Sequence, residues 1–272
     1  MKFLTSLSIS IALMAPLQAQ TPSPLPSVAE RQAKQELNEA ARAFREGKFE
    51  EAQAHSEKAL QLDPQNKLAP FFVARTIHAQ YKPGDFAPEN VAKAQEAILA
   101  YKKVLERSRS DDEAYKAVVY LYGALKQDEL QSQWILQRAA DVSFSNDKRA
   151  EAFVILASKD WDCAFRITEL PANKVTTVDG IKASIRYKMP KELVEFERAN
   201  ECANRGLEFS NMAIALTPES ESAWSYKANI LLELAKLAEM AGDVNKKTGL
   251  SRQHQEAVRE TTRLSTRSQS NP

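Results

Sequence analysis

The sequence has 272 residues, with 37 basic and 36 acidic side chains and only 7 glycines, where the usual glycine share of about 7% would give about 19. Dinucleotide-binding sheets, phosphate loops and hairpin-rich sandwiches need glycine at turns and close approaches, whereas an interior glycine destabilises a helix by about 1 kcal/mol. The composition therefore disfavours those folds and predicts an all-α protein. The balanced charge disfavours a nucleic-acid partner recognised by bulk charge.

The first 32 residues are predicted to precede the folded domain. Residues 1–19 have the pattern of a secretory signal peptide, in which Lys2 precedes an apolar or hydroxylated run and Ala19 is the small residue at the cleavage site. A membrane anchor is the alternative, but the run of 13 residues over 3–15 is shorter than the roughly 20 residues that span a bilayer. Alternate prolines favour an extended spacer over 20–32. We expect a periplasmic or secreted protein with no stable membrane insertion after cleavage.

Helix turns and helix endings recur along the rest of the chain. The turns read Gly47-Lys48-Phe49, Gly84-Asp85-Phe86 and Gly242-Asp243-Val244. The helix ending ALQLDP at 59–64 recurs as AIALTP at 213–218. Because glycine marks turns after helices and proline stops them, and the two signals alternate, the repeating unit is predicted to be a helix hairpin.

These features resemble the tetratricopeptide repeat, a 34-residue helix-turn-helix unit that stacks into a right-handed superhelix. The first repeat matches at Ala40, Gly47 and Pro64, and the fifth has Trp224 six residues after Pro218. The second helix of the third unit, at about 128–140, matches poorly. The resemblance implies an all-α superhelix of about five helix pairs, and an unrelated helical bundle is the alternative. The repeats would span about 33–66, 67–111, 112–149, 150–220 and 221–265, followed by a disordered tail at 266–272.

An insertion over 171–190 interrupts the fourth repeat. Its apolar residues alternate from Val175 to Tyr187 around Asp179-Gly180, which is a hairpin signal. An irregular loop is the alternative.

The two cysteines, Cys163 and Cys202, flank this insertion. An even number of cysteines in an exported chain predicts a disulfide, whereas the alternative is two buried thiols that pack as small apolar side chains. A bridge would fasten the base of the insertion.

No catalytic or metal-binding motif is present in the sequence. His55, His78 and His254 lie far apart without metal-ligand spacing, and the nucleotide-binding and serine-hydrolase motifs are missing. The acidic run Asp111-Asp112-Glu113 is explained by capping of a helix N-terminus. We therefore predict a protein that is not an enzyme and needs no metal or cofactor.

A stack of helix hairpins presents a concave surface lined by its first helices. The positions that the resemblance places there are Asn38, Arg45, Arg75, His78, Lys116, Tyr120, Tyr226 and Asn229. Their donors and cations suit a peptide backbone or a terminal carboxylate, although the Lys/Asn/Arg set that clamps an acidic C-terminus in chaperone-binding members is not reproduced. We expect a noncatalytic protein- or peptide-binding scaffold. The alternatives are structural self-assembly and an enzyme whose site lies in 171–190.

The C-terminal segment is basic, with six lysine or arginine residues between Lys246 and Arg267 against Glu256 and Glu260. As a helix it would present a positive surface to an acidic partner or an anionic polymer. The alternative is a solvated helix that caps the last repeat.

Overall fold

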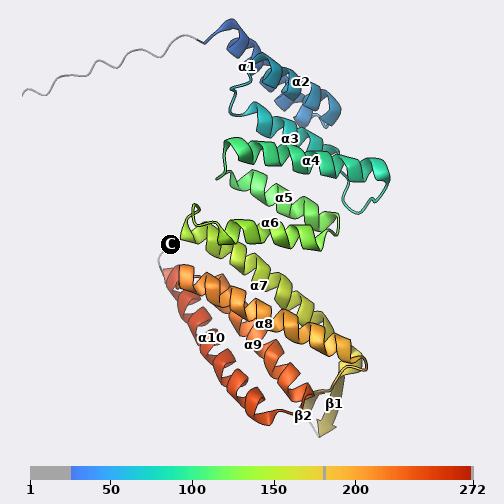
Figure 1. The fold of residues 1–272 in the computed structure, drawn as a ribbon, viewed down its shortest axis with the longest axis vertical. Helices are drawn as coiled ribbons and strands as arrows, with labels where there is room; N and C mark the ends of the chain where they lie inside the picture. Colours follow the sequence, from blue (N-terminus) through green and yellow to red (C-terminus); the bar gives the residue numbers. More distant parts are fainter. Residues whose placement is uncertain (1–25, 180–181, 271–272) are drawn as a thin grey trace, which may run out of the picture.

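The protein is described by a computed structural model over residues 26–179 and 182–270. These residues form helices, one short 3-10 turn and one two-stranded sheet (Figure 1). The helices are α1 (Val28–Arg45), α2 (Phe49–Leu62), α3 (Ala69–Gln80), α4 (Pro88–Arg107), α5 (Asp112–Ala124), α6 (Asp128–Ala140), α7 (Asn146–Thr168), α8 (Leu193–Leu216), α9 (Glu221–Met240) and α10 (Val244–Ser270), with η1 (Pro171–Asn173), β1 (Lys174–Asp179) and β2 (Lys182–Tyr187) between α7 and α8.

Helices that follow one another in the chain also pack on one another, from α1 to α10 (Figure 1). The first and second helices of each pair form a hairpin, and each second helix also contacts the first helix of the next pair. The predicted all-α stack of five helix pairs is therefore confirmed. No helix in the described part of the chain is both long enough and apolar enough to cross a membrane.

Small residues allow the helices of a hairpin to approach closely. In the first hairpin, Ala40 and Ala43 of α1 and Ala52 and Ala59 of α2 are buried. Alanine at such contacts lets the helix backbones come together without leaving voids. The same composition continues along the stack, so the core is a series of neighbouring clusters instead of one central core.

Most hairpin turns need a residue with a positive φ. Gly47 has φ 76°, and the amide of Lys48 donates to the carbonyl of Ala43 at 2.9 Å, which ends α1 in a glycine C-cap. The turn between α5 and α6 has the same form without glycine, since Lys126 takes a φ of 56°. The glycine pattern in the sequence therefore missed this turn.

The ends of the helical array differ from the predicted ones. Ser27 and Glu30 form a capping box, which satisfies free amides at the start of a helix, and α1 begins at Val28. Residues 28–32 are thus helical, and the prediction of a spacer up to residue 32 is wrong there. At the other end α10 continues to Ser270, so the predicted disordered tail is helical over 266–270. The predicted signal peptide and the start of the spacer lie outside the described residues.

The insertion forms a β-hairpin, not an irregular loop. Strands β1 and β2 are antiparallel, with Thr176 opposite Ile185 and Val178 opposite Ala183. The predicted turn residue Gly180 lies outside the described residues. Figure 1 shows the hairpin beside the end of α9, which β2 contacts.

A disulfide joins Cys163 of α7 to Cys202 of α8, with 6.1 Å between their Cα atoms. The two helices run on from this bridge to the base of the β-hairpin. The bridge therefore fixes the two helices from which the insertion emerges.

Candidate functional site

The first helices of neighbouring pairs contact one another, and several of the residues predicted to line the groove make these contacts. The guanidinium of Arg75 in α3 lies 4.8 Å from the ring centre of Phe44 in α1. The ring of His78 in α3 lies 5.7 Å from that of Tyr120 in α5. Through these contacts one continuous surface extends from the first helix pair to the third.

The same surface continues to the last pair. Lys116 of α5 pairs with Glu151 of α7 across 2.9 Å. The rings of Trp161 in α7 and Tyr226 in α9 lie 6.1 Å apart. We call the surface formed by α1, α3, α5, α7 and α9 the first-helix face.

A cavity of about 600 Å³ opens on the first-helix face between α7 and α9. Its lining residues are Trp161, Glu221, Ser222, Ser225, Tyr226 and Asn229. The volume falls in the range of ligand pockets, and two aromatic rings beside short polar side chains are typical of such sites. The cavity brings together the predicted residues Tyr226 and Asn229.

The eight residues predicted to line the groove differ in the contacts that they make. Five of them make the contacts between first helices, and Asn229 lines the cavity. Asn38 and Arg45 are exposed on α1, and none of these contacts reaches them. Trp161 was not predicted as a site residue, because no sequence motif marks it.

The first-helix face carries little unbalanced charge at its centre. Burial lowers the pKa of His78 and raises that of Tyr101 to about 12, so the contact between His78 Nδ1 and the Tyr101 hydroxyl, at 3.3 Å, joins two neutral groups at pH 7. The hydrogen bond from Lys116 to Glu151 raises the lysine pKa, which keeps this pair ionised. The centre of the face thus offers rings and hydrogen-bonding groups instead of a cluster of free cations.

The other polar groups considered in the sequence have structural partners. His55 Nδ1 lies 2.6 Å from Glu36, and His254 Nδ1 lies 2.9 Å from the carbonyl of Ala228. Asp111 caps α5, since it accepts the amide of Ala114 at 2.9 Å. Over the described residues, no three His, Cys, Asp or Glu side chains are grouped as metal ligands.

The basic helix α10 packs along α9. Its residues Leu250, Ala257 and Leu264 are buried. Three of its cations form ion pairs, in which Lys247 meets Glu239, Arg263 meets Glu260 and Arg267 meets Glu219. A helix with one buried apolar face and a charged outer face is what the end of a repeat array requires.

The stacked hairpins, their turns and their small buried residues define a fold of the tetratricopeptide-repeat type. The sequence matches no known family profile and no curated protein.

Among solved structures, the chain is similar to MamA from Desulfovibrio magneticus RS-1, with 16% identity over 82% of this chain and 96% of that chain and a TM-score of 0.40. It is similar to Pseudomonas aeruginosa pilF at 12% identity, with coverage of 89% and 100% and a TM-score of 0.39. It is also similar to YrrB, described as a TPR protein with an unusual peptide-binding site, at 12% identity, coverage of 83% and 98% and a TM-score of 0.37. Likeness at this level assigns no ligand to the chain.

Proposed function

We propose that the chain is a noncatalytic scaffold that binds a protein or peptide segment along its first-helix face, in the periplasm or outside the cell. The observation that carries this proposal is the cavity between α7 and α9, where Trp161 and Tyr226 stand beside hydroxyl and amide side chains. An extended peptide offers both partners that such a surface needs, since its backbone forms hydrogen bonds and its side chains fill pockets.

The continuity of the first-helix face supports a segment longer than one cavity. From Phe44 to Tyr226 the contacts join all five first helices. Tyr120 is half exposed near the middle of this surface, so it presents a large ring to a partner at a low cost in side-chain entropy. A bound segment is expected to cross several repeats.

The proposed location outside the cytoplasm agrees with the disulfide between Cys163 and Cys202, because disulfides persist in oxidising compartments. The signal peptide predicted from residues 1–19 remains a sequence prediction.

Site-specific photo-crosslinking in native cells tests this proposal. A crosslinking amino acid is placed at Asn229, in the cavity, or at Lys103, an exposed residue of the second helix α4. We expect a discrete partner to be captured from position 229 and not from position 103. Equal capture at both positions, or none at position 229, would contradict use of the first-helix face.

Two charge-reversal variants distinguish an effect of the first-helix face from an effect of the overall charge of the protein. Arg75→Glu with Lys116→Glu alters the first-helix face, whereas Lys103→Glu with Arg198→Glu makes the same change in charge on α4 and α8, where both residues are exposed. Only the first pair should abolish capture at position 229. Circular dichroism of both variants checks that the helices are intact.

Structural self-assembly is a second candidate, favoured by an exposed apolar surface on the β-hairpin. Val178 is 73% exposed and Ile185 54% exposed, and their positions in the register place them on one side of the sheet. Light scattering of the mature chain over a hundredfold range of concentration distinguishes the candidates. If the protein is a monomer at every concentration, self-assembly is contradicted and the scaffold function remains.

A further inference from the structure

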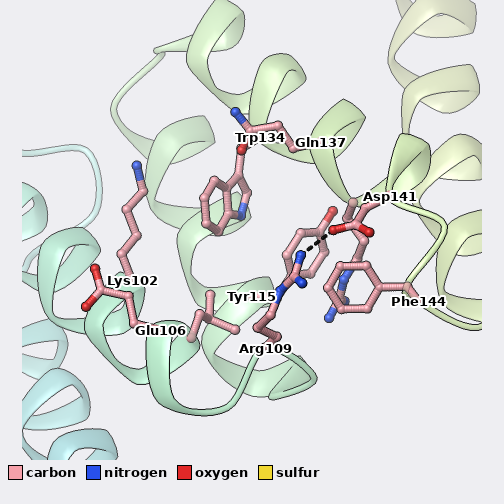
Figure 2. Close-up of a pocket in the computed structure, with 10 residues that line it drawn as sticks. Lys102, Glu106, Arg109, Tyr115, Trp134, Gln137, Asp141 and Phe144 are labelled. Atoms are coloured by element: carbon pink, nitrogen blue, oxygen red, sulfur yellow. Dashed lines mark hydrogen bonds and ion pairs between the residues drawn. The ribbon is translucent and has the colours of Figure 1, made fainter.

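A second cavity, of about 520 Å³, lies between the second helices α4 and α6. Figure 2 shows Lys102 and Glu106 reaching it from α4, and Trp134 and Gln137 reaching it from α6. Tyr115 of α5 contributes a ring between the two helices. None of these residues belongs to the cavity on the first-helix face. The cavity between α4 and α6 is therefore a separate candidate site.

A buried arginine forms part of the cavity wall. Arg138 is only 4% exposed, and its guanidinium lies 3.7 Å from the ring centre of Tyr115 and 5.0 Å from that of Phe144. Its Nη2 atom lies 2.9 Å from Asp112 Oδ1, and Lys148 reaches the same oxygen at 3.1 Å. The carboxylate is thus shared between two cations.

Hydrogen-bond donors at this cavity lack acceptors. The Tyr115 hydroxyl and Trp134 Nε1 are buried and have no hydrogen-bond partner among the described residues. Arg138 already faces an acceptor, since its Nη2 atom lies 2.9 Å from Asp112 Oδ1. Because nearly all buried polar groups in proteins are hydrogen-bonded, two unfilled donors beside a buried guanidinium indicate a site for an acceptor.

The charges around the cavity indicate that the acceptor is negatively charged. The lining contains three cations, Lys102, Arg109 and Arg138, against two anions, Glu106 and Asp141. Asp141 is already paired with Arg109, and its carboxylate accepts the amide of Ser143. Burial raises the pKa of Tyr115 above its usual value, so the hydroxyl remains a donor. One additional negative charge would balance the lining.

We propose that this cavity binds a carboxylate carried on an aromatic or branched apolar group. The carboxylate accepts from Tyr115 and Trp134 beside the positive charge of Arg138, and hydrogen bonds to an ionised acceptor are the strong ones. The apolar group packs against Leu105 and Phe144, as the volume permits.

The donors lie just below the cavity surface, so binding requires a side chain at the rim to move. Arg109 is suited to this role, because its side chain is 65% exposed and its guanidinium lies 5.6 Å from the ring of Phe144. Displaced from the ring, it adds a second cation near the bound carboxylate.

Two sources supply this chemistry, a free organic acid and the last residue of a peptide. Calorimetry with the mature full chain compares 3-phenylpropionate, a hexapeptide ending in phenylalanine with a free carboxylate, and the same peptide as its C-terminal amide. We expect at least one of the two carboxylates to bind and the amide to bind about tenfold more weakly than the free peptide, or not at all. The tighter carboxylate identifies the source. Failure of both carboxylates to bind at millimolar concentration, or equal binding of amide and acid, overturns the proposal.

Trp134→Phe is the main variant, since it keeps a ring in the cavity and removes one donor. Arg138→Gln would test the centre of the site but changes a buried charge, so exposed Arg109→Gln is the second variant. Each should weaken binding of the better carboxylate by about tenfold. Lys103→Gln, which removes an exposed cation from the same helix as Lys102, is the matched control and should change binding by less than twofold. Unchanged binding in both Trp134→Phe and Arg109→Gln would overturn the site.

Nuclear magnetic resonance of the indole N–H groups locates the bound acid. The Trp134 signal should move downfield on binding, while those of Trp161 and Trp224 stay in place, because only Trp134 lines this cavity. A shift of Trp161 alone would place the acid on the first-helix face and overturn this proposal without affecting the scaffold function.

Discussion

The ammonium of Lys236 lies 2.8 Å from a carboxylate oxygen of Glu233, and both side chains are buried in α9. The same ammonium reaches Glu169, the C-cap residue of α7, at 2.7 Å. Glu233 also accepts from the hydroxyl of Thr168, and Glu169 accepts from that of Tyr187 in β2 at 2.9 Å. This polar network ties α7, α9 and the β-hairpin together.

Lys236→Met should destabilise the protein strongly. It leaves the carboxylate of Glu233 buried without a cation, and breaking a buried ion pair in this way costs about 3–5 kcal/mol. Urea unfolding followed by circular dichroism measures the loss. Lys236→Met combined with Glu233→Leu should recover part of it, because the unpaired buried charge is gone. A loss below about 1 kcal/mol in the single variant would contradict this account.

The network also makes stability depend on pH. Burial alone would raise the pKa of Glu169, but hydrogen bonds from two lysines and Tyr187 outweigh it and lower the pKa from 4.5 to about 2. Because the folded-state pKa is depressed, the stabilisation is present above pH 4.5 and is lost as the pH falls through about 2.

Glu169→Gln isolates this contribution. Glu169 is partly exposed, so solvent screening limits its contribution to on the order of 1–2 kcal/mol. The unfolding free energies of wild type and variant should differ by this amount at neutral pH and converge towards pH 2. A difference that is constant with pH would show that the ionisation of Glu169 is not involved.

Removing the disulfide should lower stability by about 3–4 kcal/mol, since it closes a loop of 39 residues in the unfolded chain. Cys163→Ala with Cys202→Ala, compared with wild type in urea, measures the loss. Mass spectrometry after alkylation gives an independent check. Labelling of wild type without reductant would mean that the thiols are free.

Gly206 of α8 should not tolerate a larger side chain. A Cβ there would lie 3.0 Å from Asp160 Cβ and 3.1 Å from Ile230 Cδ1, so Gly206→Val overpacks the contact with α7 and α9 and should cost about 1–3 kcal/mol.

Gly249→Ala in α10 is the matched control, because no described atom outside its own stretch of helix lies within 4 Å of the added Cβ. It should stabilise the helix by up to about 1 kcal/mol. Thermal unfolding of both variants provides the comparison. Equal effects would contradict a close approach at Gly206.

Local signals were sufficient to predict the architecture. Glycine turns and proline endings predicted the helix pairs because positive φ and the missing amide of proline act within a few residues. They failed at Lys126, where a residue other than glycine takes the positive φ of the turn. They also failed at Ser27, where a capping box begins α1 earlier than predicted.

The site was only partly predictable. The resemblance gave helix positions for Tyr226 and Asn229, and the structure places both in one cavity. The cavity between α4 and α6 was missed altogether, because the second helix of the third repeat matched the signature poorly and Trp134 and Arg138 carried no motif.

By itself, the sequence determined an all-helical chain, the order of its hairpins and the possibility of one disulfide, since these depend on composition and short-range spacing. Only the tertiary structure decided that Trp161 meets Tyr226 and that Arg138 lies between Tyr115 and Phe144. Such contacts depend on how each hairpin is rotated against the next, and that rotation is set by the packing of side chains far apart in the sequence.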